Sequence, residues 1–294
     1  TAHRHLGQWP EALSAWELLL KKYPKSPLSV EALYGAADAY FALDQSREAK
    51  RAYEKAMRAN SRSDRADLAR FNLAQMAEND NELNDAAELY RYFYYELPSD
   101  PLSDVAKKRL DVLEKSSTVR PPSVPLRFKR LKKLITRRSI DRARLDVNAL
   151  QELKLSRSDT NELKFLESQL LYRERRYADA ESQLQALLKV SSRSRRNEIQ
   201  RWLARVYSTS GQTRAAIDIY LALAKNNRRN STGSSSLYRA AWLAFNGSMH
   251  SEAIKLFGEF ISRYPRSNSV TSAQWYLAWN AYRLGDIPSA IATV

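Results

Sequence analysis

Eight basic side chains and no acidic one lie between Arg120 and Arg138. The apolar residues Leu131, Leu134 and Ile135 recur three and four positions apart, so a helix here would carry the cations on its opposite face. Cations within a Debye length of about 8–10 Å add their potentials and attract a polyanion. The sequence therefore predicts an anionic-polymer site, the alternative being a solvated helix face. The predicted site residues are Arg127, Lys129, Arg130, Lys132, Lys133, Arg137 and Arg138.

A second candidate is the aromatic run from Tyr90 to Tyr95. Tyr90 and Phe93 occupy positions that pack inside the helical repeat described below. Tyr92 and Tyr95 are expected to lie off that packing face, where their rings could stack on a ligand. The alternative interpretation is that the whole run packs in the core or between repeats.

The residues of common catalytic and cofactor motifs are missing. The chain has no glycine-rich phosphate loop, no dinucleotide fingerprint and no nucleophile that shares a motif with a base. It has no Cys, which excludes disulfides and thiolate metal sites. His3 and His5 have the wrong spacing for one helix face, and His250 is expected to contact only solvent. We therefore expect no catalytic residue, cofactor or metal ion in this segment.

The elements that would position these residues are best seen in the stretch Leu237–Pro265. Apolar residues recur three and four apart on both sides of Gly247, which predicts two amphipathic helices joined by a tight turn. Small Ala241 and Ala253 would let the two backbones approach closely. Because neither helix can bury its apolar stripe alone, such a pair requires neighbouring pairs.

The same helix pair recurs along the chain. A small residue opens the second helix of each pair, and successive markers lie 37, 37, 57, 37, 36, 37 and 37 residues apart. An apolar or aromatic residue follows each marker by four positions, and a Pro follows three of them by twelve. This pattern resembles a tetratricopeptide repeat and predicts an all-α, tetratricopeptide-like α-solenoid, a superhelix of antiparallel helix pairs. The markers are Ala12, Ala49, Ala86, Ala143, Ala180, Ala216, Ala253 and Ala290.

The single 57-residue step divides the predicted solenoid. It holds an extra helix and then a segment with three Pro in five residues, which should run extended. We therefore predict a first array over 1–115, a Pro-rich hinge over 116–125 and a second array over 126–294. Residues 1–6 are interpreted as the tail of a broken first helix. Both chain ends cut through a repeat, so we expect a piece of a longer protein.

The charge of the chain widens the range of partners. The net charge is +15, which suits nucleic acid, anionic lipid, an acidic protein or an anionic wall polymer, or simply keeps an open protein soluble. No stretch approaches the roughly 20 apolar residues of a transmembrane helix. The range 226–236 is expected to be a polar loop. A second cationic patch comprises Arg193, Arg195, Arg196 and Arg201.

The second array also resembles a particular family. Trp242, the turn Tyr264-Pro265-Arg266-Ser267 and the helical stretch Ala273–Ile291 are similar to the superhelical arm of bacterial soluble lytic transglycosylases. The resemblance covers 126–294. It implies a periplasmic, non-catalytic arm that holds peptidoglycan strands or positions a catalytic domain beyond Val294. The family's catalytic Glu and its Gly-Leu-Met-Gln segment have no counterpart here.

Two other hypotheses remain open. The first array resembles periplasmic tetratricopeptide proteins in general, which implies a scaffold of the bacterial cell envelope that binds a protein partner and has no enzyme activity. A nucleic-acid-binding solenoid would need basic residues interleaved with exposed aromatic ones on one face. Since the sequence does not fix such a face, peptidoglycan or an envelope protein is the expected partner and nucleic acid is not.

Overall fold

The computed structural model describes residues 8–61, 65–116 and 118–293, and residues 1–6, interpreted above as a helix tail, lie outside these ranges. Helices account for 78% of the chain, and no strand occurs in the described ranges. The predicted all-α solenoid is therefore confirmed. The chain forms two compact units, Thr1–Lys133 and Leu134–Val294, which are described separately. None of the described helices is both long and apolar enough to span a bilayer.

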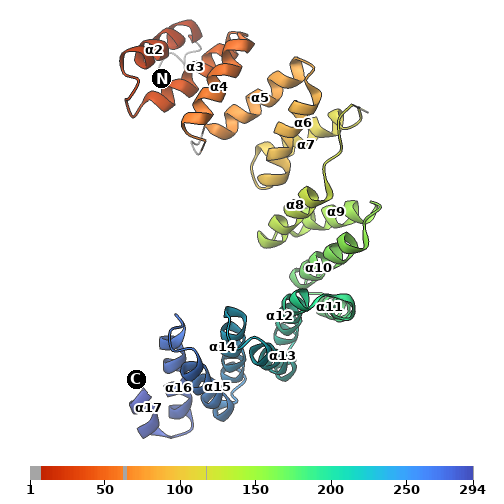
Figure 1. The fold of residues 1–294 in the computed structure, drawn as a ribbon, viewed down its shortest axis with the longest axis vertical. Coiled ribbons are helices and arrows are strands. Elements are labelled where there is room, and N and C mark those ends of the chain that lie inside the picture. The colour runs from red at the N-terminus through yellow and green to blue at the C-terminus, as the bar shows by residue number, and fades with distance from the viewer. Residues whose placement is uncertain (1–7, 62–64, 117, 294) are drawn as a thin grey trace. The chain divides into compact units, whose positions relative to one another are not determined.

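The first unit is a succession of helices that pack mainly on their neighbours in chain order (Figure 1). Its last helix, α8, crosses the boundary between the two units. The helices are α2 (Trp9–Lys22), α3 (Ser29–Ala42), α4 (Ser46–Ala59), α5 (Ala66–Asn79), α6 (Leu83–Arg91), the π-helix η1 (Tyr92–Glu96), α7 (Leu102–Leu113) and α8 (Val124–Thr136).

The second unit repeats the antiparallel pair with greater regularity. The pair predicted on either side of Gly247 is present as α14 and α15. The helices of this unit are α9 (Ile140–Gln151), α10 (Arg157–Arg173), α11 (Tyr177–Val190), α12 (Arg193–Thr209), α13 (Thr213–Asn226), α14 (Ser231–Asn246), α15 (His250–Arg263), α16 (Val270–Arg283) and α17 (Ile287–Thr293).

The predicted register of the repeat coincides with the core. The seven marker alanines from Ala12 to Ala253 are buried, at 4% exposure for Ala12 and 0% for the other six, and Ala290 is half-buried. Most of the large residues four positions later, among them Tyr53, Tyr90 and Phe257, are fully buried, whereas Trp16 is half-buried. A small residue at the marker lets the helices approach, and the large residue fills the space one turn further on. The repeat pattern in the sequence is thus the pattern of core packing.

One residue in each turn within a pair has a left-handed backbone, five positions before the marker. Gly211 and Gly285 take this conformation with φ of 85° and 82°. The next N–H donates to the carbonyl five residues earlier, as from Met249 to Ala244, which is the Schellman motif that ends many helices. In the turn of α14 and α15 the left-handed residue is Ser248, at φ 57°, and not the neighbouring glycine. The other non-glycine examples are Asp44, Asn81, Arg138 and Arg175.

Candidate functional site

The predicted basic helix is present as α8. Its apolar stripe is buried as expected, with Leu131 and Leu134 at 0% and Ile135 at 3% exposure. The helix begins at Val124, so Pro125 lies in its first turn and not in an extended hinge. The first turn tolerates proline because its N–H groups have no partner within the helix.

Three of the predicted polymer-binding cations contact the π-helix η1, although one of them, Lys129, also remains 56% exposed. The Arg130 side chain is only 4% exposed, its guanidinium lies 3.7 Å from the ring centre of Tyr94, and it donates to the Tyr94 carbonyl. Lys129 and Lys133 each place Nζ 2.5 Å from a carboxylate oxygen of Glu96. Burial alone would raise the pKa of Glu96, but the hydrogen bonds from these two lysines hold it below its ordinary value. These three cations therefore fasten α8 to the preceding π-helix.

The remaining four cations are placed differently. Lys132, Arg137 and Arg138 are exposed. Arg127 is half-buried, and its Nε is buried without a hydrogen-bond partner among the described residues. The structure thus brings the seven residues onto one short segment, where four of them are exposed: Lys129, which also pairs with Glu96, and Lys132, Arg137 and Arg138. Polymer binding by this segment stays a prediction.

The aromatic run forms the π-helix η1, whose wide turn changes which residues face the core. Tyr95 is 5% exposed and packs edge-on against Tyr94, with ring centres 4.9 Å apart. The expectation that Tyr95 lies off the packing face is therefore wrong. Tyr92 is half-buried, edge-on to Phe93 and covered by the Arg70 guanidinium at 4.5 Å from its ring centre. These contacts favour core packing over ligand stacking for both rings.

The end of the first unit is held against α6. Val119 is buried, and the Asn84 amide donates to the Thr118 carbonyl over 3.0 Å. The side chain of Arg91, which is 4% exposed, pairs with Glu114 at 2.9 Å. Arg91 also donates to the carbonyl of Arg120, which lies in the segment predicted as a hinge. This part of the range 116–125 is therefore docked on the unit, and the boundary between the units falls later, inside α8.

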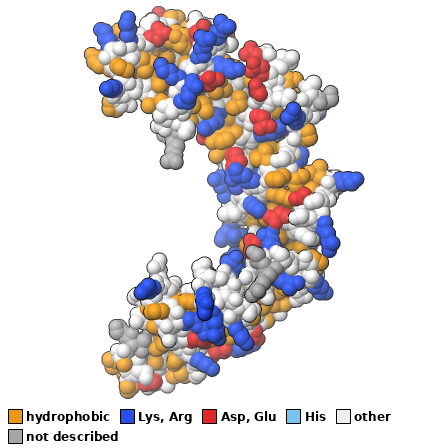
Figure 2. Space-filling view, in the orientation of Figure 1, with side chains coloured by type: hydrophobic (Ala, Val, Ile, Leu, Met, Phe, Trp, Pro, Cys, Tyr) orange, Lys and Arg blue, Asp and Glu red, His pale blue; other side chains and the backbone are white. Residues whose placement is uncertain are grey.

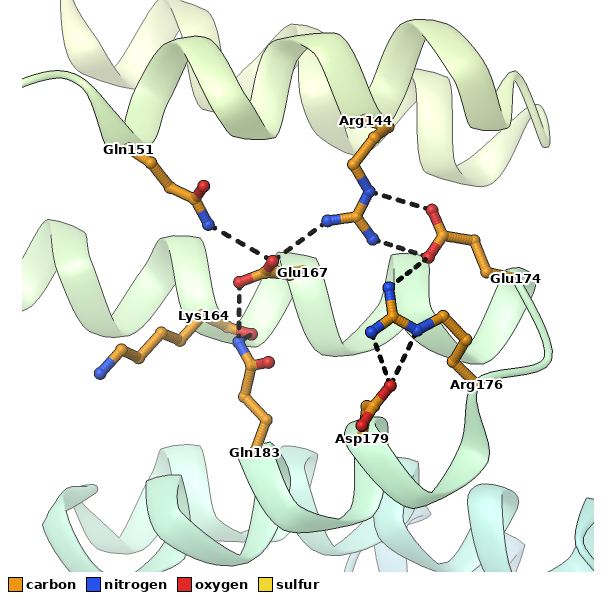
Figure 3. A network of polar contacts seen from close by, with 8 residues as sticks. All are labelled: Arg144, Gln151, Lys164, Glu167, Glu174, Arg176, Asp179 and Gln183. Atoms are coloured by element: carbon orange, nitrogen blue, oxygen red, sulfur yellow. Dashed lines mark hydrogen bonds and ion pairs between the residues drawn. The ribbon is translucent and has the colours of Figure 1, made fainter.

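Figure 3 shows a polar network that joins α9, α10 and α11. Arg144 donates to both carboxylate oxygens of Glu174, over 3.0 and 2.7 Å, and to Glu167 over 3.1 Å. Gln183 donates to the other oxygen of Glu167 over 3.1 Å, and Arg176 pairs with Asp179 and Glu174. The hydrogen bond to Glu174 raises the pKa of Arg144. Because the charges satisfy one another, this network holds helices together and offers no open anion site.

His250 also differs from expectation. Its Nδ1 lies 2.8 Å from the Oδ1 of Asn280, a fully buried residue of α16 whose amide donates to the Tyr276 carbonyl. The prediction that His250 contacts only solvent is wrong, because the next repeat brings α16 over the start of α15. No group of His, Asp and Glu suited to a metal ion occurs in the described part of the chain.

A different surface carries several arginines and few acidic residues. Between Asp218 and Asp286 the only acidic residues of the chain are Glu252 and Glu259, both on α15. Basic side chains without acidic neighbours in sequence therefore occur in three places: the connection from α13 to α14, the whole of α14, and the connection from α15 to α16. In the space-filling view, Lys and Arg side chains gather over the region of α14 (Figure 2).

The start of α14 was mispredicted, because residues 231–236 are helical and do not continue the polar loop. The side chain of Asn230 caps the helix by accepting from the N–H groups of Thr232 and Gly233, over 2.9 and 3.2 Å. Gly233 is needed because a Cβ there would lie 2.1 Å from the carbonyl oxygen of Asn227. The loop before α14 is thus pressed against the helix, which places its arginines beside the helix face.

Two adjoining hollows lie along this face. One, of about 620 Å³, is lined by Arg228, Arg229, Arg263 and Arg266, and the other, of about 480 Å³, by Arg239 with Ser235, Tyr238 and Trp242. Both are lined by Ser231, Ser234 and Ser267, and no acidic residue is found among their described lining residues. We call this surface the arginine groove, comprising Arg228, Arg229, Arg239, Arg263, Arg266, Ser231, Ser234, Ser235 and Ser267.

The aromatic rings at the groove belong to the core. Tyr238 packs edge-on against Phe257 and Phe260, with ring centres 5.9 and 5.4 Å apart. Tyr264 lies against Phe260, and its hydroxyl donates to the Arg228 carbonyl over 3.0 Å. The rings therefore support the groove, while guanidinium and hydroxyl groups provide its chemistry. This site was not predicted above, although the scarcity of acidic residues between Asp218 and Asp286 is visible in the sequence.

An apolar surface lies on α16 and α17. Trp275 and Trp279 are 54% and 41% exposed, and their rings are stacked with centres 5.8 Å apart. With Tyr282, Ile287 and Ile291 they line a hollow of about 690 Å³. All five side chains are exposed, so they form one contiguous apolar surface.

Comparisons with solved structures find several at low sequence identity. The TPR domain of P58(IPK) is 14% identical, with 99% of this chain and 79% of that chain aligned and a TM-score of 0.33. Cut9–Hcn1 of the APC/C gives 14% identity, coverage of 92% and 46%, and a TM-score of 0.41. A tetratricopeptide repeat protein from Parabacteroides merdae gives 13%, coverage of 95% and 94%, and a TM-score of 0.41.

A comparison with curated protein sequences finds no match. Nothing in the comparisons links the chain to a lytic transglycosylase. One tetratricopeptide repeat profile matches residues 1–45, 34–101 and 165–233, and a second matches 235–267. Since these ranges cover more than half of the chain and its helices form the corresponding antiparallel pairs, the chain belongs to the tetratricopeptide repeat family.

Proposed function

We propose that this tetratricopeptide solenoid is a scaffold that binds a protein partner, and that the arginine groove on α14 is the binding site. The carrying observation is the two-sided character of α14. One face carries Leu237, Ala240, Ala241 and Ala244, all buried in the core. The groove face presents hydroxyl, guanidinium and aromatic groups at spacings of three and four: Ser231, Ser234, Ser235, Tyr238, Arg239 and Trp242.

The size of the groove supports a peptide ligand. Hollows of about 480 and 620 Å³ each fall within the range of ligand sites, and three serines line both of them. The guanidinium and hydroxyl groups of the lining are hydrogen-bond donors, and the carbonyl and carboxylate oxygens of a peptide are acceptors that match them. A protein segment is therefore the partner that the lining fits.

A random-peptide display library selected on the purified protein tests this proposal. We expect enriched peptides whose binding falls at least tenfold in the variant Ser235→Trp, which fills the groove. Lys255→Trp is the matched control, because Lys255 is exposed on α15 and does not line either hollow. Selected peptides that bind both variants as well as the wild type would place the binding surface elsewhere.

Peptidoglycan is the second candidate partner, and a periplasmic location belongs to the same proposal. The observation in its favour is the exposure of Lys132, Arg137 and Arg138. Pull-down by cell-wall sacculi should weaken when these three are changed to Glu together. The control reverses the exposed Lys21, Lys22 and Lys25, so equal losses in the two variants would reject a specific site.

A further inference from the structure

We infer that the ligand of the arginine groove is an acidic segment from within a protein chain, whose Asp and Glu carboxylates bind the groove guanidiniums. This inference rests on the proposed function and adds the chemistry of the partner. It depends on three observations: the lack of ion pairs, within the described ranges, at four groove arginines, the hydroxyl groups beside them, and the packing of the nearby rings on the core.

The groove arginines differ from most arginines that the structure places in polar contacts. Arg65, Arg144 and Arg195 each bind two carboxylates of the same unit. In the groove, Arg263 pairs with Glu259, but no ion pair involving Arg228, Arg229, Arg239 or Arg266 is found in the described part of the chain. Four guanidiniums along two adjoining hollows thus keep their donors for an external anion.

Guanidinium groups suit carboxylates in particular. Each presents a planar pair of N–H donors that matches the two oxygens of a carboxylate. Ser231, Ser234 and Ser267 line both hollows and add hydroxyl donors beside the arginines. The start of α14 adds the partial positive charge of a helix N-terminus, since Ser231 is its first residue. The guanidiniums, the serine hydroxyls and the helix N-terminus all favour an anionic ligand. Because they are spread along two hollows, they suit a ligand with several carboxylates along its length.

The rings decide against nucleic acid. Single-stranded nucleic acid is bound by basic grooves with exposed aromatic faces on which bases stack. Here Tyr238 and Tyr264 are packed against Phe257 and Phe260, and Trp242 is partly buried against the same core. A peptide needs no stacking platform, because its carboxylates project from a narrow backbone. The occupied rings therefore favour a protein segment over an oligonucleotide.

Fluorescence anisotropy with a labelled twelve-residue peptide tests the inference. The peptide alternates Asp or Glu with Ser and Ala, is acetylated and amidated at its ends, and is compared with its Asn and Gln counterpart. We expect only the acidic peptide to bind, with affinity that falls as salt rises. The triple variant Arg228→Gln, Arg229→Gln and Arg266→Gln should weaken binding at least tenfold.

The matched control changes Arg47, Arg51 and Arg58 to Gln. These arginines are exposed on α4 of the first unit, so the control removes the same charge far along the sequence from the groove. Equal losses in the two triple variants would show that only net charge acts and would overturn the inference. Circular dichroism on both variants checks that each retains its helices, and a groove variant that unfolds is replaced by the single change Arg229→Gln.

Other ligands are the remaining arms of the experiment. Tighter groove-dependent binding of a phosphoserine peptide or of single-stranded oligo(dT) would overturn the carboxylate assignment. Binding only of a peptide with a free C-terminal carboxylate would overturn the assignment to an internal segment. This inference and the proposed function can fail independently. If library selection yields neutral peptides that occupy the groove, the proposed scaffold function stands and only this inference is rejected.

Discussion

Arg144 and Arg214 each bind two carboxylates, but in different surroundings. Each donates to both oxygens of one carboxylate and also binds a second carboxylate. The Arg144 side chain is 27% exposed, with its partners at 16% and 18%, whereas Arg214 is 58% exposed. Water and salt weaken an exposed pair, so burial and not geometry should decide what each contributes.

Replacement of each arginine by lysine tests this prediction, since lysine keeps the charge but loses the two-pronged contact. Arg144→Lys should lower the free energy of unfolding by about 1–2 kcal/mol, because two partly buried carboxylates lose hydrogen bonds. Arg214→Lys should change it by less than about 0.5 kcal/mol. Urea unfolding followed by circular dichroism measures both, and equal effects would show that contact geometry outweighs burial.

Glu96 gives a prediction about pH. Its pKa is lowered in the folded protein despite its burial, because Lys129 and Lys133 both donate to it. A lowered pKa stabilises the fold above the ordinary value of 4.5, and this stabilisation is lost as the pH falls through the folded-state value. At pH 7, Glu96→Gln should reduce stability by about 1 kcal/mol, and the difference from the wild type should shrink once the pH drops below 4.5.

Urea unfolding of wild type and variant at several pH values measures this difference directly. Asp85→Asn is the control, because Asp85 is exposed and has no ion pair among the described residues. Its effect should stay within about 0.5 kcal/mol at each pH. A constant penalty for Glu96→Gln down to pH 3 would contradict the role assigned to the two lysines.

At the scale of the element, the left-handed turn residue explains one limit of sequence reading. The sequence marks this position clearly only where it is glycine, as at Gly285. Elsewhere the position holds Asp, Asn, Arg or Ser. What these turns share is their backbone conformation: a left-handed residue followed by the Schellman hydrogen bond. The spacing of the marker residues therefore revealed the repeat, but the sequence did not show which residue adopts the left-handed conformation in each turn.

The turns yield a pair of opposite predictions. Gly211→Ala should destabilise the protein by about 1 kcal/mol, since an added Cβ meets no atom within 4 Å and only backbone strain changes. Arg175→Gly, at a left-handed residue with φ 63° and an exposed side chain, should stabilise it by about 0.5–1 kcal/mol. Thermal unfolding measures both changes, and two shifts of the same sign would refute the backbone explanation.

The candidate sites were harder to predict than the helices, for a physical reason. The basic run was visible in the sequence, but the pairing of Lys133 with Glu96 joins residues 37 positions apart, which only packing can reveal. The burial of Tyr95 depends on a π-helical turn that periodicity of 3.6 does not anticipate. Local pattern specifies which face a helix buries, whereas partners across repeats depend on the folded arrangement.

At the scale of the whole molecule, a solenoid is held together mainly by contacts between neighbouring helices. A core defect should therefore loosen its own surroundings before the distant repeats. Phe257 is fully buried, stacked on Tyr276 with ring centres 5.3 Å apart and edge-on to Tyr238. Tyr53 occupies the equivalent position in the first unit and is also fully buried.

We predict that Phe257→Ala costs about 3–5 kcal/mol, through lost burial and the cavity left behind. Amide hydrogen exchange read by mass spectrometry should show lost protection in α14, α15 and α16, with α3 to α5 unchanged. Tyr53→Ala is the reciprocal control and should deprotect α3 to α5 while the second unit stays protected. If either substitution lowers protection evenly along both units, the prediction is wrong and the chain unfolds cooperatively as a whole. A local defect would lower protection only in the helices that pack near the substituted residue.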